Sequence, residues 1–369
     1  MRGRDRFLKA LLRKEEPDRV PIWELIINEP VIRSLYGNVS YADFIEIMDL
    51  DGVTTGEDQR MEKISPTMYK DEWGIIWGVE PSGLSYPLKG PIKDKRDLKN
   101  YQPPDPDAPW RLNTLESLVD RFKGDKAIVF LGHEVFEFSH YLLGGMTKLL
   151  LSYYKDQELV QELADLISEY KCRVLHRAAK IGADVLLTGD DYANRSGPFV
   201  SPKIFEKFVL PYLKRAVSVA KSHGLPFIKH TDGNILPIID MIISAGIDGL
   251  HPIEPAAGMD IAYVKRRYGD KICVIGNIDC SIVLTLKPPE DVEEVVKETI
   301  AKVAPGGGYI LSSSNSIHPS VKPENFVRMI KAARRYGRYP INEHLIKNYS
   351  RRDYYREMLG WTFSRAEAA

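Results

Sequence analysis

The stretch LPFIKHTDGNILPIIDMIISAGIDGLHPIEP (225–255) decides the fold class. It begins with an apolar run, 225–233, that ends in the polar cluster HTDG. The segment PIIDMIISAG (237–246) then carries apolar residues at helical spacing, and a second apolar run, 247–255, again ends in polar residues. A short buried strand, an amphipathic helix and another short strand form a β-α-β unit, which is typical of parallel sheets.

The same alternation extends along most of the chain. Apolar runs that end in polar clusters occupy 20–26, 51–58, 127–134, 183–191, 225–233, 247–255, 272–279 and 308–316. From the third run onward the spacing leaves room for a loop and a helix, and EEVVKETIAKVA (293–304) has the pattern of an amphipathic helix. Eight parallel strands with crossover helices favour an α/β fold of the TIM (β/α)8 barrel type. An open doubly wound sheet is the alternative that this pattern leaves open.

Three segments lie outside the alternation. Residues 1–19 predict an amphipathic N-terminal helix that leads into the first strand. Segment 59–126 is an insertion after strand two, in which DEWGIIWGVEPSGLSYPLKGPI predicts a hairpin and YQPPDPDAPW a proline-rich connection. Residues 340–369 form a tail of aromatic residues and arginines that packs on the barrel or on a partner. The sequence shows no internal repeat, and we expect residues 1–369 to form one barrel domain.

The composition limits the classes of function. Lysine and arginine together number 51, as do aspartate and glutamate, so no global field attracts nucleic acid or an anionic membrane. The three cysteines form no CxxC pair, which indicates a reducing, cytoplasmic environment. No stretch reaches the roughly 18 apolar residues of a membrane span. We therefore expect a cytoplasmic protein that binds neither nucleic acid nor membrane.

Polar side chains end every one of the eight runs. They are Glu24 and Asn28, Glu57 and Asp58, His133 and Glu134, Asp190 and Asp191, His230 and Asp232, His251 and Glu254, Asn277 and Asp279, and Ser314 and Asn315. An acidic residue after a strand is often only the N-cap of the next helix. All eight ends being polar favours a reaction site, because reacting groups in a barrel come from the carboxyl ends of the strands.

A divalent metal is one use for these groups. His230 and Asp232 lie two residues apart, which places both on one side of a strand, and Glu254 follows the next strand. We take His230, Asp232 and Glu254 as the candidate ligands, with zinc as the candidate ion. The alternative is that His230 acts as a hydrogen-bonding or acid–base group, since the chain has no HExxH pattern.

The chain resembles the uroporphyrinogen decarboxylase superfamily over nearly its whole length. The supporting segments are RDRFLKALLRKEEPDRVPIW (4–23), LDGVTTGED (50–58), FEFSHYLLGG (136–145), SGPFVSPKIFEKFVLPYLKRAV (196–217), IKHTDGN (228–234), IDGLHPIEP (247–255) with GMD (258–260), GNID (276–279) and GGGYILSSSNSIHPSVKPENF (306–326). The resemblance implies a distorted TIM barrel with its cleft at the carboxyl ends of the strands. The superfamily also contains corrinoid-dependent methyltransferases, so membership leaves the reaction open.

The motifs of the true decarboxylases are only partly present. Those enzymes carry an RQAGR motif after the first strand, whose arginines bind the carboxylates of the substrate, and a histidine after the last strand. They also have an essential aspartate on the second strand and a tyrosine after the third, and this chain keeps both, as Asp58 and Tyr141. It reads WELIINEPVIR after strand one, however, and has Asn315 at the last strand. Without the arginine pair, a polyanionic porphyrinogen lacks a counter-charge.

The zinc methyltransferases of the superfamily offer a second comparison. They transfer methyl groups to a thiol, and their zinc ligands are a His-x-Cys pair after strand five and a cysteine after strand eight. Here those positions are His230, Asp232 and Asn315, so both sulfur ligands are missing. His230 with carboxylates would form a harder, oxygen-rich site.

The HTDGN sequence resembles instead a branch that contains the first methyltransferases of corrinoid O-demethylation. The resemblance implies transfer of methyl from a small donor, such as a methoxylated aromatic, to a corrinoid protein. The chain lacks a DxHxxG cobalamin signature, so the corrinoid arrives on a partner, and family analogy implies a homodimer. The alternatives are a decarboxylase or lyase acting on a smaller carboxylic acid, and a non-catalytic barrel that binds a small molecule or a partner protein.

These interpretations assign roles to named side chains. We expect His230, Asp58, Asp191 and Glu134 to be catalytic, because acid or metal polarisation of a leaving oxygen requires such groups. The candidate substrate-binding residues are Trp23, Glu24, Tyr141, His133, Asn277 and Asn315. For Trp23 and Tyr141 the alternative is packing in the core, which is the commoner role of aromatic side chains.

Overall fold

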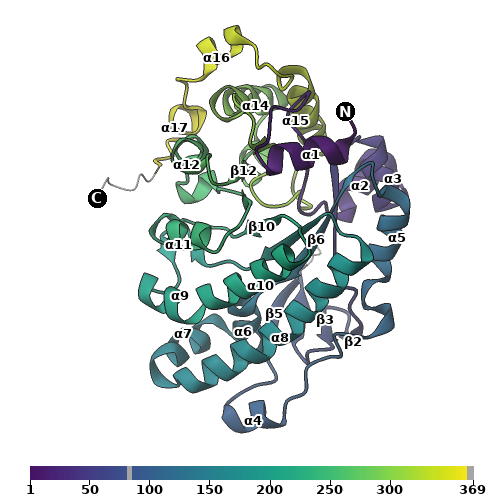
Figure 1. Cartoon of the computed structure of the whole chain (residues 1–369), viewed down its shortest axis with the longest axis vertical. Coiled ribbons are helices and arrows are strands. Elements are labelled where there is room, and N and C mark those ends of the chain that lie inside the picture. Colours follow the sequence, from purple (N-terminus) through teal and green to yellow (C-terminus); the bar gives the residue numbers. More distant parts are fainter. Residues whose placement is uncertain (81–84, 364–369) are drawn as a thin grey trace.

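The computed structural model describes residues 1–80 and 85–363 (Figure 1). Its centre is a seven-stranded parallel sheet in the order β1-β6-β7-β10-β11-β12-β13. The strands are β1 (Gly52–Gly56), β6 (Ala127–His133), β7 (Val185–Gly189), β10 (Phe227–His230), β11 (Gly249–His251), β12 (Cys273–Ile275) and β13 (Tyr309–Ile310). Each lies inside one of the predicted runs, so the parallel α/β class and seven predicted strands are confirmed.

The first predicted run, 20–26, is not a regular strand, and there the prediction was wrong. Ile22 makes an isolated parallel bridge with Leu311 after β13, and the Leu311 N–H donates to the Pro21 carbonyl at 2.9 Å. Pro21 has no N–H to continue the ladder. On the other side, the Asp51 N–H before β1 donates to the Ile22 carbonyl at 2.9 Å. The run therefore fills the eighth position and closes the sheet into a distorted barrel.

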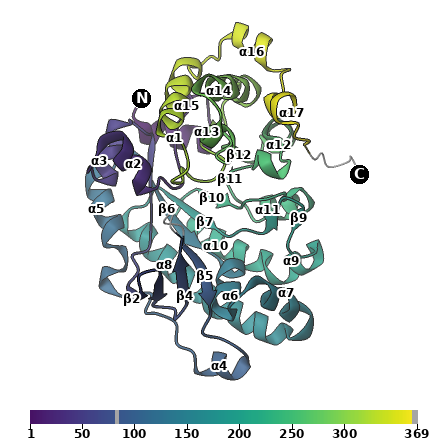
Figure 2. The same ribbon diagram turned by 180° about the vertical axis from the view of Figure 1, so that it is seen from behind.

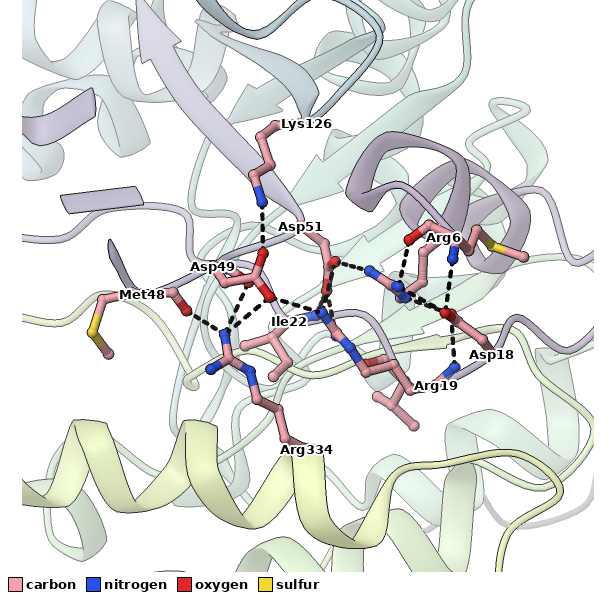
Figure 3. A network of polar contacts seen from close by, with 11 residues as sticks. Arg6, Asp18, Arg19, Ile22, Met48, Asp49, Asp51, Lys126 and Arg334 are labelled. Atoms are coloured by element: carbon pink, nitrogen blue, oxygen red, sulfur yellow. Dashed lines mark hydrogen bonds and ion pairs between the residues drawn. The ribbon is translucent and has the colours of Figure 1, made fainter. Parts of the chain in front are cut away.

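A buried carboxylate fixes this irregular segment (Figure 3). Asp51 is fully buried, and its oxygens accept hydrogen bonds from Arg6 at 2.5 Å, from Arg19 at 2.7 and 3.1 Å, and from the Ile22 N–H at 2.8 Å. These donors come from the N-terminal helix α1 (Gly3–Leu11) and from the segment after it. Asp51 thus joins α1, the first run and β1 at one point.

Helices cover the outside of the barrel (Figures 1 and 2). Those that follow successive barrel strands are α5 (Asn113–Phe122), α6 (Val135–Leu143), α7 (Met146–Lys155), α8 (Gln157–Ile181), α9 (Pro202–Phe208), α10 (Leu210–Ser222), α11 (Ile239–Ser244), α12 (Ile261–Tyr268), α13 (Val283–Leu286), α14 (Pro289–Val303) and α15 (Pro323–Tyr336). The predicted helices at 237–246 and 293–304 correspond to α11 and α14. Figure 1 shows α8 and α10 side by side across one face of the sheet.

The barrel interior is a separate apolar cluster. It contains Phe7, Ala10, Leu11, Trp23, Leu25, Ala127, Val129, Val185, Leu187, Ile228, Cys273, Ile275 and Ile310. Phe7 of α1 meets Trp23 edge to face, with ring centroids 6.0 Å apart. Since α1 contributes Phe7, Ala10 and Leu11 to this cluster, the helix seals the end of the barrel where the strands begin. The opposite end, at the carboxyl ends of the strands, holds the polar groups.

The segments outside the barrel differ in detail from the predictions. The N-terminal helix ends at Leu11, well short of residue 19. The insertion holds α4 (Lys95–Asn100) and an antiparallel sheet, β2 (Met61–Ser65), β3 (Met68–Asp71), β4 (Ile76–Val79) and β5 (Ser85–Lys89), of which β4 and β5 are the predicted hairpin. Its last part, α5, packs on β1 and β6 as a barrel helix, so the insertion ends before residue 113. Figure 2 shows this sheet in the lower half of the molecule.

The C-terminal tail packs on the barrel. Helices α16 (Glu343–Tyr349) and α17 (Tyr354–Leu359) lie at the end of the molecule remote from the insertion (Figure 2). Tyr355 is buried, and its hydroxyl donates to the Asn277 carbonyl and accepts the Asp279 N–H, both at 3.2 Å. The last part of the predicted tail, 364–369, lies outside the described residues.

The cysteines and the apolar content of the helices were also considered in the sequence. All three cysteines are free thiols. Within residues 1–80 and 85–363, no helix combines the length and the apolar composition that crossing a membrane requires.

We expect Asp51→Asn to lower the free energy of unfolding by about 3–5 kcal/mol, because Arg6 and Arg19 lose their buried counter-charge. Asp49→Asn is the matched control. The Asp49 side chain is 60% exposed and pairs with Lys126 at 2.8 Å, so its loss should cost less than about 1 kcal/mol. Urea unfolding followed by circular dichroism measures both values. Equal, small losses for the two variants would contradict the role assigned to Asp51.

Candidate active site

Two histidines meet at the carboxyl ends of neighbouring strands. β10 and β11 pair in parallel with His230 opposite His251. Both side chains are buried, and their Nδ1 atoms lie 2.7 Å apart. One Nδ1 must therefore carry a proton that the other accepts.

The surroundings of His251 decide which nitrogen carries the proton. Burial lowers the pKa of His251 well below its usual range, while a backbone hydrogen bond to Ser313 acts in the opposite direction. His251 Nε2 lies 3.2 Å from Ser312 Oγ. The Ser312 hydroxyl donates its one proton to Glu24, so toward His251 it acts as the acceptor, and His251 Nε2 is the donor. His251 Nδ1 is then the acceptor, His230 carries its proton on Nδ1, and His230 Nε2 keeps its lone pair.

The chain of hydrogen bonds continues to Glu24. Ser312 Oγ donates to Glu24 at 3.2 Å, and Ser313 donates to the same carboxyl from its N–H at 3.0 Å and its hydroxyl at 2.6 Å. Glu24 is only 2% exposed, and this burial raises its pKa to about 8. Glu24 therefore lies behind the histidines rather than open to the mouth, at the far end of a buried polar relay.

Two carboxylates face the other nitrogen of His230. Asp191 Oδ1 lies 3.9 Å and Asp232 Oδ1 3.8 Å from His230 Nε2. The Asp232 N–H donates to Asp191 at 2.8 Å, and the Asn315 amide donates to the second oxygen of Asp232. Asp190, in contrast, is fully buried and accepts the N–H groups at the start of α6. Alternation along the chain thus brings only Asp191 to His230.

Burial and crowding change the protonation of this cluster. Burial raises the pKa of Asp191 to about 7, helped by the nearby charge of Glu137. Burial and the charge of Asp191 raise the pKa of Asp232 well above its usual range. Burial lowers the pKa of His230 to about 3, helped by the charge of Lys229. At neutral pH the His230 imidazole is therefore neutral, and both carboxyls keep their protons to a higher pH than a free aspartate does.

The same three residues fit a metal ion. One ligand atom from each of Asp191, His230 and Asp232 lies within 4.8 Å of the others. Asp232 Oδ1 is buried and has no hydrogen-bond partner, which is an uncompensated polar atom that a cation would satisfy. One imidazole and two carboxylates are ordinary zinc ligands, and without sulfur they also suit harder ions.

The predicted ligand Glu254 is not one of the three residues. Its carboxyl accepts the Gly233 N–H at 2.9 Å, which holds the turn after β10. Its place beside His230 is taken by Asp191, which follows the preceding strand β7. The metal set that the geometry favours is therefore Asp191, His230 and Asp232.

Glu134 lies in a second buried network beside the first. Lys229 donates to its carboxyl at 2.9 Å, and Thr188 and Tyr192 donate to the same group. Glu134 is 3% exposed and Lys229 is fully buried. The Glu134 carboxylate thus compensates the charge of Lys229 below the candidate active site. Glu134 itself is not accessible from the mouth of the barrel.

The rim of the mouth on the β6 side carries His133 and Tyr141. His133 Nδ1 lies 3.8 Å from Glu137, and the Tyr141 hydroxyl donates to the same carboxyl at 2.8 Å. His133 is about one third exposed. Both predicted residues therefore stand where a substrate could reach them, and their substrate-binding role stays a prediction.

Three residues that we assigned to catalysis or to substrate binding form hydrogen bonds within the protein. Asp58 accepts the Thr114 N–H at 3.0 Å and the Thr114 hydroxyl at 2.5 Å, and so holds the start of α5. Trp23 is fully buried in the barrel interior, where its indole N–H donates to Thr54 at 2.9 Å. The Asn277 amide donates to the Ile253 carbonyl at 2.9 Å. Their roles in the reaction stay predictions.

Several residues of the site had no role in the sequence-based assignment. His251 ends a predicted run, but nothing in its spacing indicated a contact with His230. The signal for Lys229 is a charged residue directly after the apolar residues PFI of the predicted run 225–233. Ser312 and Glu137 gave no signal, because a serine in a strand and a glutamate in a helix are common without function.

The chain matches a known protein family over most of its length. The sequence model of the family described as "Uroporphyrinogen decarboxylase (URO-D)" matches residues 80–336. The uroporphyrinogen decarboxylase of Pseudoalteromonas atlantica is 24% identical over 363 residues, covering 90% of this chain and 97% of that protein. That of Geobacter metallireducens is 24% identical over 278 residues, covering 71% and 78%.

Among solved structures, a methyltransferase from Methanosarcina mazei superposes with a TM-score of 0.71. It is 18% identical, and the match covers 91% of this chain and 99% of that one. The likeness shows that the two proteins share a fold.

We expect His230 to be the Nδ1–H tautomer and to stay neutral at pH 5, because its pKa is lowered to about 3. Long-range ¹H–¹⁵N NMR of the histidine-labelled, chelator-treated protein distinguishes the tautomers. His318 is the internal control. Its Nε2 faces the Cys280 carbonyl at 3.0 Å and its Nδ1 accepts the Ser320 N–H, so it must be the opposite tautomer. A proton on His230 Nε2 would contradict the relay.

Proposed function

Because the chain belongs to the uroporphyrinogen decarboxylase family, we propose that it is the methyltransferase type of enzyme within that family. It moves a methyl group from a small donor, such as a methoxylated aromatic, to a corrinoid carried by a partner protein. The observation that carries this proposal is the cluster of Asp191, His230 and Asp232 at the mouth of the barrel. The methyltransferase name of the Methanosarcina mazei neighbour supports it.

The chemistry requires a proton at the leaving oxygen. The methyl carbon–oxygen bond of the donor breaks, and its electron pair stays on the oxygen. The methyl group passes to the reduced corrinoid of the partner, which supplies the electron pair of the new bond. Asp232, backed by Asp191, holds a proton at neutral pH and is the acid that we assign to the leaving oxygen.

His230 has two roles in this proposal. Its Nε2, with a free lone pair, lies 3.8 Å from Asp232 and 3.9 Å from Asp191. Because the pKa of His230 is lowered to about 3, the proton stays on the carboxyl side, ready for transfer. The same lone pair and the two carboxylates would hold a metal ion, which would polarise the leaving oxygen when bound. In either case the relay through His251 fixes the orientation of the ring.

The local geometry gives less support to decarboxylation. Asp58 and Tyr141 match the family's positions for that reaction, but Asp58 is held by Thr114 at the start of α5. Tyr141 is held by Glu137, and burial raises its pKa far above the usual range, so it stays a neutral phenol. A homodimer and a corrinoid-protein partner complete the proposal.

The test follows methylcorrinoid formation by absorbance, with reduced corrinoid protein and a panel of methoxylated aromatics and methylamines. We expect the rate to fall by roughly 100-fold or more in Asp232→Asn, which removes the acid, and in His230→Ala, which removes the imidazole beside the acid. His344→Ala, which changes an exposed histidine at the start of α16, is the matched control and should keep the wild-type rate. Wild-type rates in His230→Ala, or no methyl transfer from any donor, would contradict the proposal.

A further inference from the structure

An apolar pocket opens at the mouth of the barrel, on the side of the first run and β1. It has a volume of about 220 Å³. Its lining consists of Leu25, Ile26, Ile27, Tyr41, Thr54, Thr55, Gly56 and Leu131. Ile26 is 42% exposed at its edge, whereas Leu25 and Ile27 are buried at its wall.

The lining contains no charged side chain, and its polar groups already have partners. The Thr54 hydroxyl accepts the indole N–H of Trp23 at 2.9 Å and donates to the Glu24 carbonyl at 3.1 Å. The Thr55 hydroxyl donates to the Gly56 carbonyl at 3.4 Å. Burial raises the pKa of Tyr41 to about 12, so its hydroxyl stays neutral. The pocket therefore favours an uncharged, apolar group over a carboxylate.

Gly189 connects this pocket with His230. A Cβ placed on Gly189 would lie 3.5 Å from Leu131 Cδ1 and 3.6 Å from His230 Cδ2. Leu131 lines the pocket, and His230 belongs to the candidate active site. Since glycine has no side chain, a methyl-sized space remains between Leu131 and His230. A group bound against Leu131 therefore has room for one methyl-sized substituent on the side of His230.

The volume limits the size of the group. A cavity of about 150 Å³ is enough to bind benzene. On this scale the 220 Å³ here hold one six-membered ring, and a second fused ring would extend beyond the lining. Pockets that enclose whole ligands usually measure roughly 300–1,000 Å³. This pocket is therefore a subsite for one part of a ligand.

We infer that the pocket binds a single apolar ring of the methyl donor, with the methyl-bearing oxygen directed across Gly189 toward His230 and Asp232. The inference rests on the proposed function for the identity of the ligand, but the ring subsite itself is defined by binding alone. It assigns Leu131 and Gly189 as residues that determine which donors fit.

The test is calorimetric titration of the chain with methoxybenzene, without any corrinoid. We expect methoxybenzene to bind, and 2-methoxynaphthalene to bind at least tenfold more weakly. Leu131→Phe fills the pocket and should weaken methoxybenzene binding at least tenfold. Leu286→Phe makes the same change at a side chain that is 66% exposed, and should leave binding unchanged.

Gly189→Ala is the second variant, in case Leu131→Phe does not fold. Its added methyl would make only ordinary contacts, and the glycine lies in a regular strand, so the fold should be retained. It should also weaken methoxybenzene binding at least tenfold.

The outcomes separate this inference from the proposed function. No binding of methoxybenzene, equal binding of the naphthalene compound, or equal affinity in Gly189→Ala and the wild type would overturn the ring subsite. Methyl transfer from methylamines could still be found in that case, and the proposed function would stand. Binding with the expected dependence on Leu131 and Gly189, but without methyl transfer, would support the subsite and overturn the function.

Discussion

The hydrogen bonds of the Asp51 carboxylate are the constraint on which the rest of the molecule depends. They hold the first run against β1 although Pro21 interrupts its ladder with β13. With the run in place, the barrel closes and Glu24 reaches Ser312 and Ser313. The relay from Glu24 through Ser312 and His251 then orients His230. An ion-pair network at the closed end of the barrel therefore determines the geometry of the open end.

The open end combines two environments that complement each other. On the β7 and β10 side, Asp191 and Asp232 lie 3.9 and 3.8 Å from Nε2 of His230, and burial raises the pKa of both carboxyls. On the β1 side, Leu25 and Leu131 border an uncharged pocket. An acid next to an apolar subsite suits a donor with an apolar body and a leaving oxygen. The same arrangement offers no counter-charge in the pocket for a polyanionic porphyrinogen.

Much of this architecture could be predicted from the sequence because apolar periodicity reports burial directly. Seven of the eight predicted runs contain strands. His230 and Asp232 lie together because alternate residues of an extended chain point to the same side. The strand prediction for the first run was wrong because this run is held in place by hydrogen bonds to the Asp51 side chain. Hydrophobic periodicity does not report such bonds. The position of Asp191 beside His230 was not predicted, because Asp191 follows a different strand, β7, and the metal-ligand role of Glu254 stays a prediction. The contact between His230 and His251 depends on strand register, which only the folded barrel specifies.

If methyl transfer occurs at Asp191, His230 and Asp232, as we propose, a labelled methyl group must leave its donor at this site. The most direct measurement is ¹³C NMR of a single turnover with a methyl-¹³C-labelled donor and the reduced corrinoid protein. We expect the label to move to the cobalt-bound methyl position with an equal amount of demethylated donor, and Asp232→Asn to leave it on the donor. If the label stays on the donor with the wild type, while the same preparation releases carbon dioxide from uroporphyrinogen, the enzyme is a decarboxylase and not a methyltransferase.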